Sequence, residues 1–129
     1  VVIHTRNSLK ETIKIVSKPE FKDLKGIFHC FDGNYKDAMK LIDLGFLLGI
    51  GGILTFKNSN LRDTIEKIGI EKLVLETDSP YLSPEPYRGK RNEPANILFI
   101  AEMLEQITAI PLIKISQITT KNAIELFDL

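Results

Sequence analysis

Short apolar runs alternate along the chain with longer stretches that have helical periodicity, and this alternation limits the fold more than any other feature. The apolar runs cover residues 1–4, 26–29, 46–50 and 72–76, and the stretches between them cover residues 8–16, 35–44 and 61–68. Short, uniformly apolar runs are typical of strands buried on both faces. Parallel neighbouring strands need a crossover, which is usually a helix. The sequence therefore predicts an α/β protein with about four parallel strands and flanking helices.

The last third of the chain follows a different pattern. A proline-rich loop over residues 79–89 is followed by predicted helices over residues 97–108 and 112–118, and by a final helix after Thr119 and Thr120. Ser8 and Asn92 are the expected N-caps of the first helix and of the helix after the loop. Because no repeat or interdomain linker is visible, we expect residues 1–129 to belong to one domain.

Composition excludes several classes of protein. The chain has 17 Lys and Arg against 17 Asp and Glu, so a broadly basic surface for non-specific duplex binding is not expected, although a local basic cluster could bind phosphates. The longest uncharged stretch, residues 44–56, contains four glycines and is shorter than the roughly 20 apolar residues of a membrane span. With a single cysteine, Cys30, the chain has no internal disulfide. These features predict a cytoplasmic protein without a membrane partner.

Three side chains that can bind metal, His4, His29 and Asp78, each end or directly follow a predicted strand. In parallel sheets and barrels, ligands bind at the carboxyl ends of the strands, where the loops converge. Two imidazoles and a carboxylate suit a divalent ion such as Zn, Mn or Fe, and Asp78 could serve both as ligand and as base for a metal-activated water. The alternative is structural: hydrogen-bonded core histidines, and an Asx turn before Ser79 and Pro80. Both interpretations stay open at this point.

A cluster of cations lies between the long loop and the following helix. Arg88, Lys90 and Arg91 fall within four residues, with Gly89 among them. Guanidinium forks, a glycine that admits close backbone approach and a helix N-terminus together suit a phosphate. The alternative is a solvated loop without a ligand, and the position next to the expected metal site favours the phosphate.

Other features are assigned more modest roles. The glycine-rich segment 49–52 lacks the spacing of a dinucleotide fingerprint and is interpreted as a tight turn. Cys30 is expected to be a packed thiol that points to the opposite strand face from His29, rather than a nucleophile. Glu76 and Arg6 could support the metal ligands or contact phosphate, and each could equally be part of an ion pair.

These residues also fall into motifs with a fixed order. They are Val2-Ile3-His4-Thr5-Arg6, Phe28-His29-Cys30-Phe31, the segment 48–58, Glu76-Thr77-Asp78-Ser79-Pro80-Tyr81-Leu82 and the segment 86–94. The series resembles the C-terminal half of the TatD-type metal-dependent deoxyribonucleases, and the resemblance covers essentially the whole chain, including residues 119–123.

This resemblance implies a fold and an activity. The family is a (β/α)8 barrel of the metallo-dependent hydrolase type, whose members use Mg, Mn or Zn and often trim single-stranded DNA from the 3′ end. It implies that His4 and His29 are ligands of one metal centre, with two ions in the complete enzyme. Asp78 would be ligand and base, and Arg88 and its neighbours would hold the DNA backbone. The alternative activity is the hydrolysis of an ester or amide, because the fold does not fix the substrate.

The chain departs from the family in one large respect. The family's His-x-His strand and bridging Glu are absent, and a complete barrel has about 250 residues. The chain also opens on the apolar strand Val1-Val2-Ile3 without an initiator Met. We therefore expect a fragment, the C-terminal half of one barrel, that is impaired or inactive on its own. Its expected partners are the missing N-terminal half or a second copy of the chain.

Overall fold

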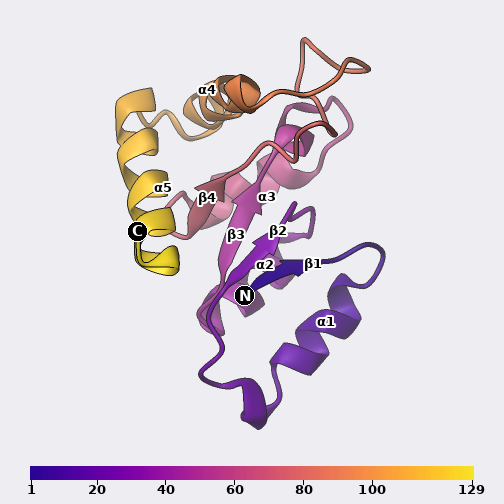
Figure 1. Cartoon of the computed structure of the whole chain (residues 1–129), viewed down its shortest axis with the longest axis vertical. Coiled ribbons are helices and arrows are strands. Elements are labelled where there is room, and N and C mark those ends of the chain that lie inside the picture. The colour runs from indigo at the N-terminus through magenta and orange to yellow at the C-terminus, as the bar shows by residue number, and fades with distance from the viewer.

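The four predicted strands form a single sheet in the computed structural model, which describes residues 1–129. The strands are β1 (Val2–His4), β2 (Ile27–His29), β3 (Leu47–Ile50) and β4 (Leu73–Leu75), and their order in the sheet is the order of the sequence. All neighbouring strands are parallel, so that their carboxyl ends meet at one edge. Figure 1 shows the sheet with its flanking helices. The predicted fold class is confirmed.

Helices connect the strands and follow the last of them. They are α1 (Leu9–Val16), α2 (Tyr35–Asp43), α3 (Leu61–Ile68), α4 (Ile97–Thr108) and α5 (Leu112–Phe127), with short 3-10 turns η1 (Pro19–Phe21), η2 (Gly52–Thr55) and η3 (Pro94–Asn96). No single helix is long and apolar enough to cross a membrane; the segments Pro94–Thr108 and Leu112–Phe127 pass that test only as a pair, which is bent by 114°.

The predicted break at Thr119 and Thr120 is wrong, because α5 is one continuous helix. Thr119 lies one turn after Ile115, and both side chains are buried on the same side of the helix. The Thr119 hydroxyl donates to the Ile115 carbonyl at 2.9 Å, so its polar group is satisfied inside the helix. Burial of this face therefore outweighs the weak helix propensity of threonine.

Ser8 is the N-cap residue of α1, as predicted, but its side chain makes no capping hydrogen bond. Instead, the Thr12 hydroxyl donates to the Ser8 carbonyl. A side-chain N-cap is present at α2, where the Asn34 side chain accepts from the Asp37 N–H at 3.1 Å.

The two faces of the sheet are packed differently. Alternate strand residues, among them Phe28, Leu48 and Leu73, point toward the helices and belong to a core cluster of 17 buried residues. The register places the other strand residues on the opposite face, which we call the inner face. Its apolar members, Val2, Ile27, Leu47 and Val74, lie outside that cluster. The candidate site lies at the carboxyl end of this inner face.

Candidate metal-binding site

The two histidines lie next to each other at the ends of β1 and β2. They are register partners, and their ring centroids are 5.5 Å apart. Asp78, which follows β4, places its Oδ1 3.5 Å from His29 Nε2. All three side chains line a pocket of about 810 Å³, together with Arg6. The structure therefore brings the three candidate ligands and Arg6 together at the predicted edge.

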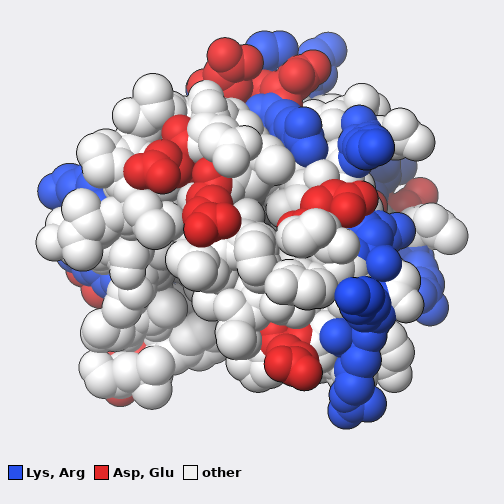
Figure 2. All heavy atoms as spheres, turned by 90° about the horizontal axis from the view of Figure 1, so that it is seen from above, with Lys and Arg blue, Asp and Glu red and all other residues white.

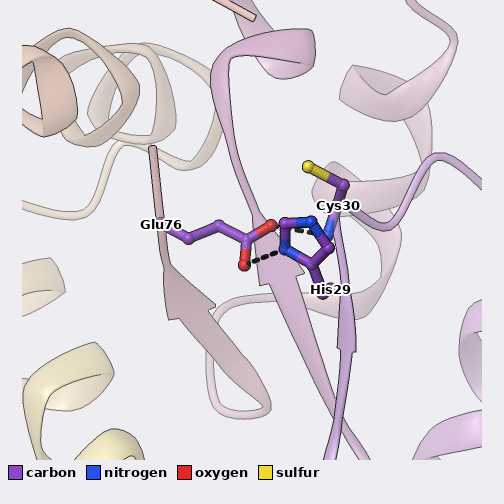
Figure 3. A group of neighbouring side chains, drawn as sticks. All are labelled: His29, Cys30 and Glu76. Atoms are coloured by element: carbon purple, nitrogen blue, oxygen red, sulfur yellow. Dashed lines mark hydrogen bonds and ion pairs between the residues drawn. The ribbon is translucent and has the colours of Figure 1, made fainter. Parts of the chain in front are cut away.

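Glu76 joins the site from the end of β4. Its Oε2 lies 2.8 Å from His29 Nδ1, and its Oε1 accepts the backbone N–H of Cys30. Figure 3 shows the side chain reaching across β3 to His29, at the end of β2, and to Cys30, which directly follows it. A carboxylate that accepts from Nδ1 holds the imidazole in the tautomer whose Nε2 carries a free lone pair. Glu76 thus orients His29.

Gly49 on β3 creates the space through which Glu76 passes. A Cβ at this position would lie 2.8 Å from Glu76 Oε2 and 3.0 Å from the carboxyl carbon. Any side chain here would displace the carboxylate. The interpretation of the glycine-rich segment as a tight turn therefore misses its main role at Gly49, which is close approach by a side chain from the neighbouring strand.

Asp78 is held in a backbone conformation that aims its side chain at the site. Its φ is +55°, in the left-handed region that aspartate tolerates better than most residues. An Asx turn at Asp78 would need the N–H two residues on, at Pro80, which proline lacks, and the Ser79 N–H donates to the Thr77 hydroxyl. The structural alternative of an Asx turn at Asp78 is therefore not what the structure shows, and the carboxylate faces His29 instead.

Asn92 ties the long loop back to the end of β4. Its side chain is buried, and its Nδ2 donates to the carbonyls of Thr77 and Tyr81, each at 2.7 Å. Its Oδ1 accepts from the Glu93 N–H. The predicted role of Asn92 as a helix N-cap is wrong, because α4 begins after Asn96 and η3 after Glu93. Asn92 fixes the loop that carries Asp78.

Cys30 lies on the same side as His29, so the predicted opposite orientation is wrong. The strand ends at His29, and Cys30 has a φ of +48°, which breaks the strand alternation. Ligand atoms of His29, Cys30 and Glu76 all lie within 4.8 Å of one another. Burial first, then the carboxylates of Glu76, Asp78 and Asp32, raise the pKa of the Cys30 thiol well above its ordinary value. A neutral thiol is a poor nucleophile, as expected from the sequence.

The donor set fits a divalent cation. When Nδ1–H donates to Glu76, the neutral imidazole of His29 presents its Nε2 lone pair toward Asp78, whose Oδ1 lies 3.5 Å away. Two ligands about 2.1 Å from one ion at a tetrahedral angle are about 3.4 Å apart. The ring of His4 stands beside that of His29 and is exposed to the pocket. The residues that could hold the ion are therefore His4, His29 and Asp78.

The basic loop lies outside the pocket lining. The Arg88 guanidinium stacks on the Phe56 ring, with Cζ 3.7 Å from the ring centroid, and Lys90 Nζ lies 5.5 Å from the centroid of Tyr87. Arg91 is exposed. None of these three cations lines the pocket that contains the histidines. Their role in binding phosphate stays a prediction. Figure 2 shows Lys and Arg gathering along one side of the molecule, while the side of α4 and α5 is largely uncharged.

The sequence reasoning assigned no role to two ionisable residues of the pocket lining, Asp32 and Tyr81. Asp32 follows His29 in the same segment after β2, and that position next to a candidate ligand was a usable signal. Tyr81 is 68% exposed and lies in the long loop. Its only signal was its place shortly after Asp78.

Barrel-type metal-dependent hydrolases hold their metal in this way, on imidazoles and carboxylates presented to a common pocket by the ends of parallel strands. Comparison with known proteins agrees, because residues 1–128 match the family described as TatD related DNase. The chain belongs to the TatD family.

Individual relatives support this assignment. The chain is 47% identical to an uncharacterized metal-dependent hydrolase, BU355, of Buchnera aphidicola, covering 100% of this chain and 49% of that protein. It is 39% identical to the uncharacterized metal-dependent hydrolase YcfH of Escherichia coli, over 98% of this chain and 48% of YcfH. The crystal structure of YjjV, a TatD homolog from Escherichia coli, superposes with a TM-score of 0.92 at 27% identity, over 100% of this chain and 50% of that one. The chain thus spans about half the length of the relatives that it matches.

Proposed function

We propose that this chain is the C-terminal half of a TatD-type deoxyribonuclease, a 3′–5′ exonuclease that hydrolyses single-stranded DNA with a metal-activated water. The observation that carries the proposal is the convergence of His4, His29 and Asp78 on one pocket at the strand ends. The family description, TatD related DNase, supports the choice of DNA as substrate. The four-stranded sheet and the coverage of half the relatives' length support its placement as one half of a barrel.

Each residue has a proposed task. An ion held by His4, His29 and Asp78, either Mg, Mn or Zn, would supply an activated water and neutralise charge on the phosphoryl oxygen. The Asp78 carboxylate, whose side chain is 30% exposed, accepts the proton of the attacking water. Glu76 keeps His29 in the tautomer that a ligand needs.

The basic residues are proposed to hold the DNA backbone. Stacking of Arg88 on Phe56 restricts the guanidinium but leaves its N–H edge free for a phosphate. Lys90 and Arg91 are exposed on the same loop and add positive charge. Arg6 lines the pocket itself and is the cation best placed to contact a phosphate near the metal ligands.

The test is a comparison of substrates with the purified chain. Single-stranded DNA labelled at the 5′ end is incubated with Mg, Mn or Zn, beside neutral ester and amide substrates. We expect slow, stepwise shortening of the DNA from its 3′ end, lost with a chelator and in Asp78→Ala. The exposed residue Asp63 on α3 provides a matched control, Asp63→Ala, which should retain activity.

Two results would contradict the proposal. Hydrolysis of the ester or amide alone would assign the site to a different hydrolase reaction. DNA cleavage that survives Asp78→Ala would place the activity elsewhere or in a contaminant. Inactivity toward all substrates by a chain that binds the metal would favour a catalytically inactive half barrel.

A further inference from the structure

The loop between β4 and α4 forms, together with Phe56, a surface of rings and cations outside the metal-binding pocket. The Arg88 guanidinium lies on the half-buried ring of Phe56, with its Cζ 3.7 Å from the ring centroid. Arg88 is exposed and takes part in none of the four ion pairs of the chain, so the face of the guanidinium that points away from Phe56 is open to solvent. We call the surface formed by Phe56, Tyr87, Arg88 and Lys90 the loop platform.

Phe56 is held from the side of β3, which is an inner strand of the sheet. It directly follows η2, which packs against α4. From α3, the Arg62 guanidinium donates to the carbonyls of Leu54 at 3.2 Å and Thr55 at 2.9 Å. The backbone that carries the Phe56 ring is therefore fixed by the connection of an inner strand, not by an edge of the sheet.

The loop itself is hydrogen-bonded to the same turn. The Glu85 N–H donates at 2.9 Å to the hydroxyl of Thr55, which is buried. The hydroxyl of the buried Ser83 donates at 2.6 Å to the Lys90 carbonyl and closes the loop across its base. Figure 1 shows the loop above the carboxyl ends of the strands. Because these bonds join both sides of the stack, the loop platform exists before any ligand binds, which lowers the entropy lost on binding.

Tyr87 adds a second ring to the loop platform. It packs against Phe99 with 5.2 Å between ring centroids and an interplanar angle of 64°, and Lys90 Nζ lies 5.5 Å from its ring centroid. The Tyr87 residue is still 37% exposed. A site that binds phosphate alone needs only N–H donors, whereas planar guanidinium and aromatic faces also stack on nucleobases. The chemistry of the loop platform thus favours a ligand that has both phosphates and unpaired bases.

The loop platform and the pocket are connected by one loop. Tyr81 and Leu82 line the pocket, and Arg88 follows six residues after Leu82. Six residues span at most about 22 Å. A strand of about seven nucleotides covers this distance at a stacked spacing of about 3.4 Å. One strand of DNA can therefore contact the metal ligands and the loop platform at once.

We propose that the loop platform binds unpaired bases of single-stranded DNA, with one base stacked on the free face of the Arg88 guanidinium. The inference rests on the proposed function for the choice of DNA, and it deepens that function because bases, as well as phosphates, contribute to binding. The N–H edge of Arg88 stays available to a phosphate of the same strand. Bases of a duplex are already stacked on one another, so the loop platform selects single strands.

The experiment measures DNA binding by the purified chain without metal, in excess chelator, so that no DNA is hydrolysed. Fluorescence anisotropy follows two labelled strands of about 12 nucleotides, one of thymidine nucleotides and one abasic, which carry the same phosphates. We expect the thymidine strand to bind at least about fivefold more tightly than the abasic strand.

Arg88→Lys is the main test variant, because lysine keeps the positive charge but has no planar face. It should weaken binding of the thymidine strand about 5- to 100-fold, toward the affinity for the abasic strand, whose binding should stay almost unchanged. Phe56→Leu removes the ring behind the guanidinium and should act in the same direction. Lys67→Ala is the control: it removes an exposed cation in the last turn of α3 and should leave the ratio of the two affinities unchanged. Circular dichroism checks that each variant folds.

Three results would overturn the proposal. Equal binding of the thymidine and abasic strands would mean that the loop platform holds phosphates only. A base preference that survives both Arg88→Lys and Phe56→Leu would place the base contacts elsewhere, and the absence of binding to either strand would remove the site. The nuclease activity is tested separately: a chain that shows the base preference but cleaves no DNA when metal is added would contradict the proposed function and keep this binding site.

Discussion

The outer and inner faces of the same short strands differ in packing and in polarity. On the outer face, Leu48 and Leu73 are fully buried among helices in one core cluster. On the inner face, Ile27 and Val74 are buried outside that cluster, Leu47 is half-buried and Val2 is exposed. Toward the carboxyl ends, the inner face changes to His4, His29 and Glu76.

This contrast separates stability from function within one sheet. The outer face buries apolar area without polar groups, which is the main source of folding free energy. The inner face holds imidazoles and carboxylates close together, an arrangement that stabilises the fold little without a cation. We infer that the single chain folds by its outer face and gains its chemistry from the inner one, and four substitutions or modifications test this division.

The largest expected effect is on folding. Leu48→Ala should lower the free energy of unfolding by about 2–5 kcal/mol, because it leaves a cavity in a fully buried cluster. Leu47→Ala, the matched change on the inner face, should cost less than about 1.5 kcal/mol, because its side chain keeps partial contact with solvent. Urea denaturation followed by circular dichroism measures both. Equal losses at the two positions would break the comparison.

The next effect is on metal binding. Glu76→Gln should weaken affinity for Zn or Mn about 10- to 100-fold with little loss of stability, because residues that orient a ligand have effects of this size. The substitution turns one of the two accepting oxygens into an NH2 donor, so either the His29 Nδ1–H or the Cys30 N–H loses its acceptor. Competition with a chelating dye measures the affinity. The exposed Glu66 on α3 supplies the control, Glu66→Gln. Equal affinities in the two variants would remove Glu76 from the site.

A smaller effect is expected from one methyl group beneath that carboxylate. Gly49→Ala would place a Cβ 2.8 Å from Glu76 Oε2, so the side chain must shift, at a cost of about 1–3 kcal/mol. Gly51→Ala is the matched control, because its Cβ would lie 3.7 Å from the nearest atom of Glu76, an ordinary contact. Thermal unfolding and metal titration of both variants give the measurement. If the two alanines behave alike, the close approach at Gly49 does not position Glu76.

The sequence predicted what depends on pattern along the chain. The periodicity of apolar residues was sufficient to predict the four strands and their parallel arrangement. The positions of His4, His29 and Asp78 at strand ends were sufficient to predict that they lie together. These predictions succeeded because parallel strands in sequence order place equivalent positions at one edge.

Features that depend on contacts between distant residues could not be read from the pattern. The hydrogen bond between Glu76 and His29 forms because the Glu76 side chain, at the end of β4, crosses β3 at Gly49. These three residues belong to separate segments of the sequence. The orientation of Cys30 depends on a positive φ directly after β2, which propensity does not indicate for cysteine. Asparagine is a common N-cap residue, so Asn92 was a reasonable candidate. In the folded chain its amide instead donates to the carbonyls of Thr77 and Tyr81, which the sequence pattern does not indicate.

The smallest expected effect concerns the Cys30 thiol, on the inner face at the edge of the polar group. Burial and three neighbouring carboxylates raise its pKa, so the folded chain should have little thiolate at neutral pH. Alkylation with iodoacetamide, followed by mass spectrometry, should be much slower in the folded chain than in urea. Because the folded state binds this proton more tightly than the unfolded state, stability should fall slightly as the pH rises past the ordinary thiol range, near 9.0. In Glu76→Gln the alkylation should become only partly faster, because burial is the larger cause. Alkylation of the folded chain as fast as in urea would contradict the burial of Cys30. It would mean that the carboxyl ends of the strands are open to solvent on the inner face, while the outer face stays packed.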